Sequence, residues 1–163
     1  MLKHDLSNLA IFQGLEGCEL EHIAPLVNLC YYGSEDVIFE QDQAAVYLYI
    51  LLEGEVVISY KPYDGPPLTV ARISPGGVFG WSAALRREKY TSAAIAATSV
   101  TAICMSSDEL KKLCQTNPHT GELLLDHLAA AIAQRLNSTH SQILSILVQG
   151  MDIKPDEGER DDR

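Results

Sequence analysis

The spacing of apolar residues changes twice along the chain and divides it into three zones. In residues 1–30 apolar side chains recur at helical spacing, for example Leu20 and Ile23, after a break at Gly14 and Gly17. This zone is expected to form short helices that pack on one end of the next zone.

The second zone, from Tyr31 to Met105, consists of short runs rich in Val, Ile, Tyr and Phe, cut by Gly, Pro, Asp and Asn about every ten residues. Such spacing is typical of an all-β sandwich or barrel. The predicted strands cover residues 36–40, 45–52, 55–60, 68–73, 91–97 and 100–106. Between the third and fourth of them, residues 62–67 are rich in Pro and Gly and predict a hairpin tip.

The last zone is predicted to be helical. Ser106 and Glu109 form a capping box, and Asn117 followed by Pro118 is a typical helix start. A helix from Pro118 to Gln149 would be roughly 45 Å long. Gly150 is a residue that can end it, and residues 151–163 are expected to form an acidic, disordered tail.

One row of mostly apolar side chains follows this long helix at spacings near three and four. Because a single small barrel can hardly cover a helix of this length, the row predicts an interface with a second copy of the chain. The predicted interface residues are Leu125, Leu128, Ile132, Leu136, Ile143 and Leu147.

Two stretches of the β zone carry a family resemblance. Residues 36–42 and 48–56 resemble the first hairpin of cyclic nucleotide-binding domains, with Asp42 where that family usually has a glycine. Residues 75–85 and 90–97 resemble its phosphate-binding cassette. The order of elements also resembles the sensor domains of catabolite-activator and fumarate-nitrate regulators. The resemblance implies a mainly β fold with flanking helices, a double-stranded β-helix (jelly roll) over about residues 31–106, within one domain spanning residues 1–150.

The resemblance also implies a ligand site in the cassette. Gly80 would let the backbone turn into a short helix, whose amides at residues 81–83 would form an anion site. Hydroxyl groups would add hydrogen bonds, and the implied ligand is a cyclic nucleotide or another small anion. The candidate site residues are Phe79, Gly80, Trp81, Ser82, Ala83, Tyr90, Thr91 and Ser92.

Two cassette positions depart from the family pattern. Ligand-binding members carry a glutamate for the ribose where this chain has Trp81, and an arginine for the phosphate where it has Tyr90. Losing two charge-assisted hydrogen-bonding groups would cost about 3–6 kcal/mol of binding. The two aromatic residues either fill the pocket, or offer a stacking face and a phenolic donor to a different ligand. Undiminished cyclic nucleotide binding is a further alternative.

Other functions are disfavoured by what the sequence lacks. A cupin-like enzyme needs clustered histidines on its strands, and none occurs between His22 and His119. The net charge of -10 repels nucleic acid, and only 13 residues follow Gly150, which leaves no room for a helix-turn-helix. No apolar run is long enough for a membrane span and no signal peptide is visible, so we expect a cytoplasmic protein. Taken together, these observations predict a non-enzymatic regulatory or sensor module that acts as a homodimer on a small ligand or a protein partner.

The four cysteines show no CxxC spacing and lie in apolar or helical surroundings. They are expected to be free, buried thiols, with no role in metal binding. They are Cys18, Cys30, Cys104 and Cys114.

Overall fold

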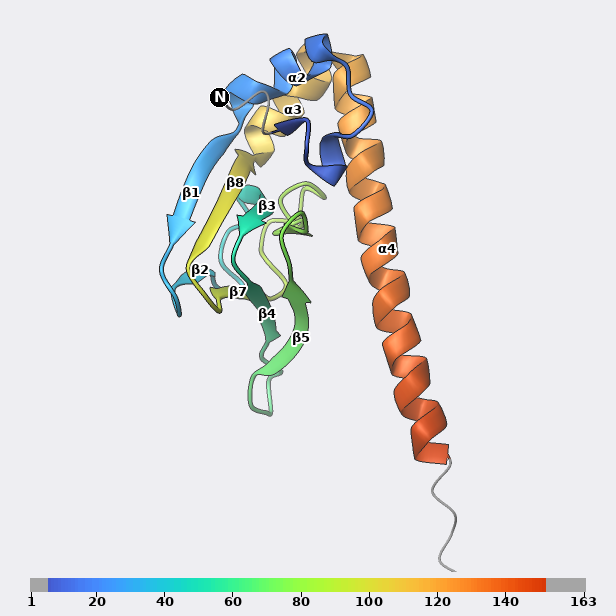
Figure 1. Ribbon diagram of the computed structural model, residues 1–163. Coiled ribbons are helices and arrows are strands. Elements are labelled where there is room, and N and C mark those ends of the chain that lie inside the picture. The colour runs from blue at the N-terminus through green and yellow to red at the C-terminus, as the bar shows by residue number, and fades with distance from the viewer. Residues whose placement is uncertain (1–5, 152–163) are drawn as a thin grey trace, which may run out of the picture. The chain divides into compact units, whose positions relative to one another are not determined.

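The computed structural model describes residues 6–151 and contains two four-stranded antiparallel sheets. The first sheet has the order β1-β8-β3-β6 and the second the order β2-β7-β4-β5 (Figure 1). The strands are β1 (Asn28–Tyr32), β2 (Val37–Phe39), β3 (Tyr47–Glu53), β4 (Val56–Tyr60), β5 (Leu68–Ile73), β6 (Val78–Phe79), β7 (Ala93–Ala96) and β8 (Val100–Ser106). This arrangement confirms the predicted jelly roll.

The central strands of the first sheet, β3 and β8, are buried on both faces, and the sheet therefore separates two hydrophobic clusters. Successive side chains of a strand point to opposite faces. In β3, Tyr49 and Leu51 belong to the cluster between the two sheets, which we call the inter-sheet cluster. Leu48 and Ile50 belong to the cluster formed with the helices, which we call the helix-side cluster. The unbroken apolar run of β3 follows from this double burial.

The two C-terminal helices begin where the sequence predicts them. The N-terminal elements are η1 (Ala10–Phe12), α2 (Gly17–Ile23) and η2 (Ala24–Leu26), and the C-terminal ones are α3 (Ser107–Thr116) and α4 (Pro118–Met151). Figure 1 shows α2 and α3 together at one end of β1 and β8. The Ser106 hydroxyl accepts from the Glu109 amide, and the Glu109 carboxylate accepts from the Ser106 amide, which confirms the capping box.

Two strands were not predicted. The helical zone ends at Leu26, four residues earlier than expected, and β1 takes the residues from Asn28 onward. Its pairing with β8, which joins Asn28 to Cys104 and Tyr32 to Val100, is a long-range contact that no local pattern reveals. The second, β6, has only two residues, Val78 and Phe79, and it forms by pairing with β3.

The chain divides into two compact units, residues 1–131 and 132–163, and α4 contributes to both. In the first unit, Leu128 is 2% exposed in the helix-side cluster, so this predicted interface residue belongs instead to the core of the protomer. In the second unit, the helix continues through Gly150 to Met151, so Gly150 does not end it. The rest of the predicted acidic tail and the Ile143 side chain lie outside the described residues.

Candidate functional site: the cassette

Gly80 occupies a position that only glycine can fill. Its φ is +71°, in the left-handed region. A Cβ there would lie 2.9 Å from both the Tyr47 carbonyl oxygen and Cδ2 of Tyr49. The predicted tight turn at Gly80 is therefore present, and it brings the cassette against β3.

The segment after Gly80 differs from the expectation. Residues 81–86 form consecutive turns instead of a short helix. Within them, the Ala83 amide donates to the Gly80 carbonyl (3.2 Å) and the Leu85 amide to that of Trp81 (3.0 Å). The Ala83 amide was predicted to face a bound anion, but here it closes a turn.

Tyr90 lies between the two sheets with only 3% of its surface exposed. Its ring stacks on Phe39, with centroids 3.8 Å apart and an interplanar angle of 16°. Its hydroxyl donates to the Tyr47 carbonyl (2.6 Å) and accepts from the Tyr47 amide (3.0 Å). Both hydrogen-bonding functions of the phenol are thus used within the protein.

The main chain holds Tyr90 in place as well. Its amide donates to the Gln43 carbonyl and its carbonyl accepts from the Asp42 amide, each at 2.9 Å. Asp42 has a φ of +67°, which confirms the prediction that aspartate can occupy this left-handed turn position. The turn at residues 42–43 therefore holds the main chain of Tyr90 in place, and the side chain of Tyr90 lies in the inter-sheet cluster.

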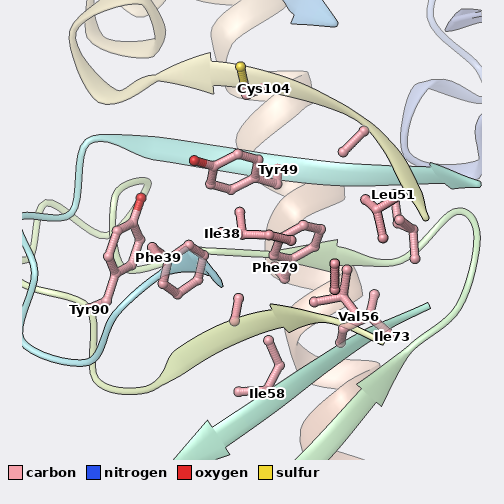
Figure 2. Packing of buried hydrophobic residues seen from close by; sticks show 14 of the residues in the cluster. Ile38, Phe39, Tyr49, Leu51, Val56, Ile58, Ile73, Phe79, Tyr90 and Cys104 are labelled. Carbon is pink, nitrogen blue, oxygen red and sulfur yellow. The ribbon is translucent and has the colours of Figure 1, made fainter. Parts of the chain in front are cut away.

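A row of four aromatic rings fills the space beside the cassette. The Tyr49 and Phe79 rings stack with centroids 5.0 Å apart, and Phe39 lies 5.8 Å from Tyr49 and 6.3 Å from Phe79. Figure 2 shows Tyr90, Phe39 and Phe79 one after another between the strands, with Tyr49 above them. Offset stacking of this kind stabilises aromatic pairs beyond the area they bury.

The site carries little charge. Burial is the main cause that raises the pKa of the Tyr90 phenol, and it also raises the pKa of Tyr49, so both phenols stay protonated at neutral pH. Among the residues whose burial the structure describes, the one buried charged residue is Glu19, which belongs to α2. The described residues of the inter-sheet cluster include no cationic side chain that would neutralise a phosphate.

Trp81 points to the other cluster. It is partly buried and packs, together with Ala84, against the helix-side cluster. Of the two aromatic substitutions, Tyr90 fills the space between the sheets and Trp81 does not. The interpretation that both residues fill one pocket is therefore wrong for Trp81, and the phenol predicted to bind a ligand is bonded to Tyr47 instead.

The remaining predicted polar groups are dispersed. Ser82 is buried, Ser92 is half-buried and Thr91 is exposed. Three basic residues between the two halves of the cassette, Arg86, Arg87 and Lys89, are also exposed. Phe79, by contrast, is 1% exposed and belongs to the inter-sheet cluster.

Sequence reasoning missed the partners of Tyr90. Phe39, Tyr47 and Tyr49 lie in predicted strands, and the alternation of Tyr47 with Tyr49 could have placed both on one face. Their convergence on residue 90 depends on the pairing of distant segments.

Within residues 6–151, no cluster of three or more His, Cys, Asp or Glu side chains is arranged to hold a metal ion. Among the helices of these same residues, none combines the length and the apolar character that a membrane span requires.

Comparison with known proteins supports the family resemblance. The family model "Cyclic nucleotide-binding domain" matches residues 29–117. The chain is 30% identical over 116 residues to the cAMP-activated global transcriptional regulator CRP of Pasteurella multocida, covering 71% of this chain and 54% of that protein. It is 25% identical over 142 residues to a CRP-like cAMP-activated global transcriptional regulator of Mycobacterium tuberculosis, covering 87% and 62%. The chain thus spans little more than half the length of these relatives.

Solved structures agree with this match. A putative cyclic nucleotide-binding protein from Geobacter metallireducens superposes with a TM-score of 0.73 at 29% identity, covering 83% of this chain and 98% of that one. A cyclic nucleotide-binding domain from Methylobacillus flagellatus gives a TM-score of 0.78 at 17% identity, covering 88% and 81%. The second likeness, at this low identity, concerns the fold alone.

Proposed function

The chain belongs to the cyclic nucleotide-binding domain family, and we propose that it is a non-enzymatic regulatory module whose cassette is closed to cyclic nucleotides. In this proposal the module works as a homodimer and responds to a protein partner or to a different small ligand. A regulatory sensor role agrees with the relatives, which are named as regulators. The closed cassette and the dimer are the parts that need testing.

The observation that carries the proposal is the position of Tyr90. The family resemblance places an arginine here in ligand-binding members, and that arginine neutralises the cyclic phosphate. In this chain the residue is a neutral phenol, buried between the sheets and hydrogen-bonded to the main chain of Tyr47. A nucleotide would have to displace the ring before it could enter.

Two costs oppose nucleotide binding. Moving Tyr90 would break its stack on Phe39 and its two partly buried hydrogen bonds to the main chain of Tyr47, and each group left unsatisfied costs about 1–3 kcal/mol. The missing arginine and glutamate remove about 3–6 kcal/mol of attraction. Together they lower the expected affinity by several orders of magnitude.

The helix-side cluster supplies a route from the cassette to α4. Trp81 and Ala84 pack against this cluster, which also contains Leu124 and Leu128 of α4. A partner that shifts residues 81–86 would therefore change the packing of the first turns of α4. Such a partner acts only if it binds one of the two arrangements more tightly.

The second candidate is a genuine cAMP sensor, which the names of the two curated relatives favour. Isothermal titration calorimetry of the full chain with cAMP and cGMP up to millimolar concentration separates the two functions. We expect no heat of binding and no change in emission from Trp81, the one tryptophan of the chain. Micromolar or tighter binding of either nucleotide would contradict the closed cassette and establish the second candidate.

The proposed dimer uses the exposed apolar face of α4. The face retains four residues of the predicted interface, since Leu128 belongs to the core and the Ile143 side chain is not described. Leu125 is 40% exposed, Leu136 61% and Leu147 57%, while Ile132 is half-buried. Large apolar side chains left in water at helical spacing are typical of a helix that pairs with a second copy.

Replacing Leu136 and Leu147 by lysine is expected to weaken the dimer at least 100-fold. Each leucine contributes about 1.5–3 kcal/mol when buried, and each would be lost from both protomers. Sedimentation velocity over a concentration series measures the change. The matched control places the same charges at the exposed Gln134 and Gln149, where the dissociation constant should hardly move. A wild-type chain that sediments as a monomer at every concentration would contradict the dimer.

The remaining predictions concern DNA and location. The net charge of -10 supports the proposal that this chain does not bind DNA by itself, although its relatives are named as transcriptional regulators. The cytoplasmic location stays a prediction as well.

A further inference from the structure

Two cysteines lie in direct contact on neighbouring strands. Cys30 in β1 and Cys104 in β8 have their Sγ atoms 2.7 Å apart, although 74 positions separate them in the sequence. In the β1–β8 register Cys30 is opposite Ala102 and Cys104 is opposite Asn28, so the two cysteines are diagonal neighbours on one face of the sheet. Diagonal neighbours in an antiparallel pair are farther apart than directly opposite residues, so the contact shows that the two side chains turn toward each other.

The two thiols differ in their surroundings. Cys104 is 6% exposed within the inter-sheet cluster, whereas Cys30 is half-buried on β1, the edge strand of the sheet. Burial, followed by the contact with Cys30, raises the pKa of the Cys104 thiol to about 12. Cys104 therefore stays protonated, and Cys30 is the thiol that a small oxidant in solution reaches first.

We propose that Cys30 and Cys104 form a reversible intramolecular disulfide when the protein meets hydrogen peroxide. A disulfide bond is about 2.05 Å long, so the two sulfur atoms need to approach by roughly 0.7 Å. That shift is small because both side chains already point at each other from paired strands.

The reaction has two steps, oxidation of Cys30 and then formation of the disulfide. The Cys30 thiol loses its proton, its sulfur attacks one oxygen of hydrogen peroxide and the O–O bond breaks. Cys30 becomes a sulfenic acid, and the leaving hydroxide takes up the proton that the thiol lost and departs as water. The Cys104 sulfur then attacks the sulfenic sulfur, its proton leaves with the hydroxide as a second water, and the S–S bond forms. Two thiols are oxidised and one peroxide is reduced to two waters, and a dithiol reductant reverses the change.

The bond would constrain the part of the fold that holds the cassette. It closes the loop from residue 30 to residue 104, which contains β2 to β7 and residues 79–92. A disulfide that closes so long a loop restricts the unfolded chain strongly. For a chain of this size we expect the oxidised protein to melt about 5–15 °C higher than the reduced protein.

The test uses the full chain with Cys18→Ser and Cys114→Ser, which leaves only the proposed pair. Cys18 is exposed, contrary to the prediction that all four thiols are buried, and it would otherwise form bonds between chains. After treatment with hydrogen peroxide, we expect the thiols counted under denaturing conditions to fall from two to none, and the intact mass to drop by two hydrogen atoms. The melting temperature should rise, and dithiothreitol should restore all three values.

The matched control adds Cys30→Ser to the same chain. Its remaining thiol can gain oxygen but cannot close a bond, so neither the mass loss nor the higher melting temperature should appear. If a serine variant does not fold, peptide mapping of the peroxide-treated wild-type chain replaces this test. It should yield a disulfide-linked pair of peptides that joins Cys30 to Cys104. Survival of both thiols in excess peroxide, addition of oxygen without loss of hydrogen, or exclusively intermolecular bonds would overturn the proposal.

Discussion

Replacing Tyr90 by alanine is expected to lower the free energy of unfolding by about 3–5 kcal/mol, the range measured for truncating large buried aromatic residues. The ring is 3% exposed and stacks on Phe39 at 3.8 Å. Its removal leaves a cavity beside Phe39 and also leaves the amide and carbonyl of Tyr47 without the partner they have in Tyr90. Urea unfolding followed by circular dichroism measures the change.

Tyr90→Phe divides this cost into its two parts. The phenylalanine ring keeps the stack on Phe39 but leaves the Tyr47 amide and carbonyl unsatisfied, so we expect a loss of about 1–3 kcal/mol. The matched control is Tyr63→Ala at the hairpin tip, where the side chain is fully exposed and the stability should change by less than about 0.5 kcal/mol. If Tyr90→Ala were as mild as Tyr63→Ala, Tyr90 would not be the residue that closes the cassette.

Local backbone chemistry made several features predictable from the sequence. Asp42 and Gly80 both adopt the left-handed conformation expected of them, and the capping box at Ser106 and the helix start at Pro118 lie where predicted. Each of these features depends on a few adjacent residues. The conformational preferences of these adjacent residues act before any tertiary contact forms. A sequence pattern can therefore reveal the features that depend on them.

The features that sequence reasoning missed depend on pairing between distant segments. The sequence placed Trp81 and Tyr90 in one cassette, but it could not show that they enter different clusters. The directions differ because β6 pairs with β3, which sends Phe79 to the inter-sheet cluster and Val78 to the helix-side cluster, and the turns after Gly80 carry Trp81 to the latter. Similarly, β1 exists because β8 pairs with it.

This division gives the two cassette substitutions different consequences. In the proposed function, Tyr90 closes the space that a ligand would enter, whereas Trp81 packs against the helix-side cluster. A closed cassette is thus compatible with a contact from the cassette to the first turns of α4.

Restoring the two charged residues is expected to create cyclic nucleotide binding. By the family resemblance, Trp81→Glu with Tyr90→Arg would return a carboxylate for the ribose and a guanidinium for the cyclic phosphate, and would remove the Tyr90 ring that closes the space. To reach a ligand there, the glutamate has to turn away from the helix-side cluster, against which Trp81 packs. The two groups are worth about 3–6 kcal/mol, which corresponds to roughly a 100-fold to 10,000-fold gain in affinity for cAMP over the wild-type chain. The double variant has lost the one tryptophan of the chain, so fluorescence emission cannot report binding. Calorimetry measures the gain in affinity instead.

The double variant will also be less stable, and this cost limits the gain. Arginine can donate to the Tyr47 carbonyl but cannot accept from the Tyr47 amide, so one of the two hydrogen bonds made by Tyr90 is lost. The matched control, Trp81→Gln with Tyr90→Met, opens the space with uncharged side chains of similar reach, and we expect no gain in affinity from it. If the charged variant is folded and binds cAMP no better than this control, residues 81 and 90 do not correspond to the nucleotide-binding positions of the family, because opening the space and restoring the charges would then both have failed to rebuild the site.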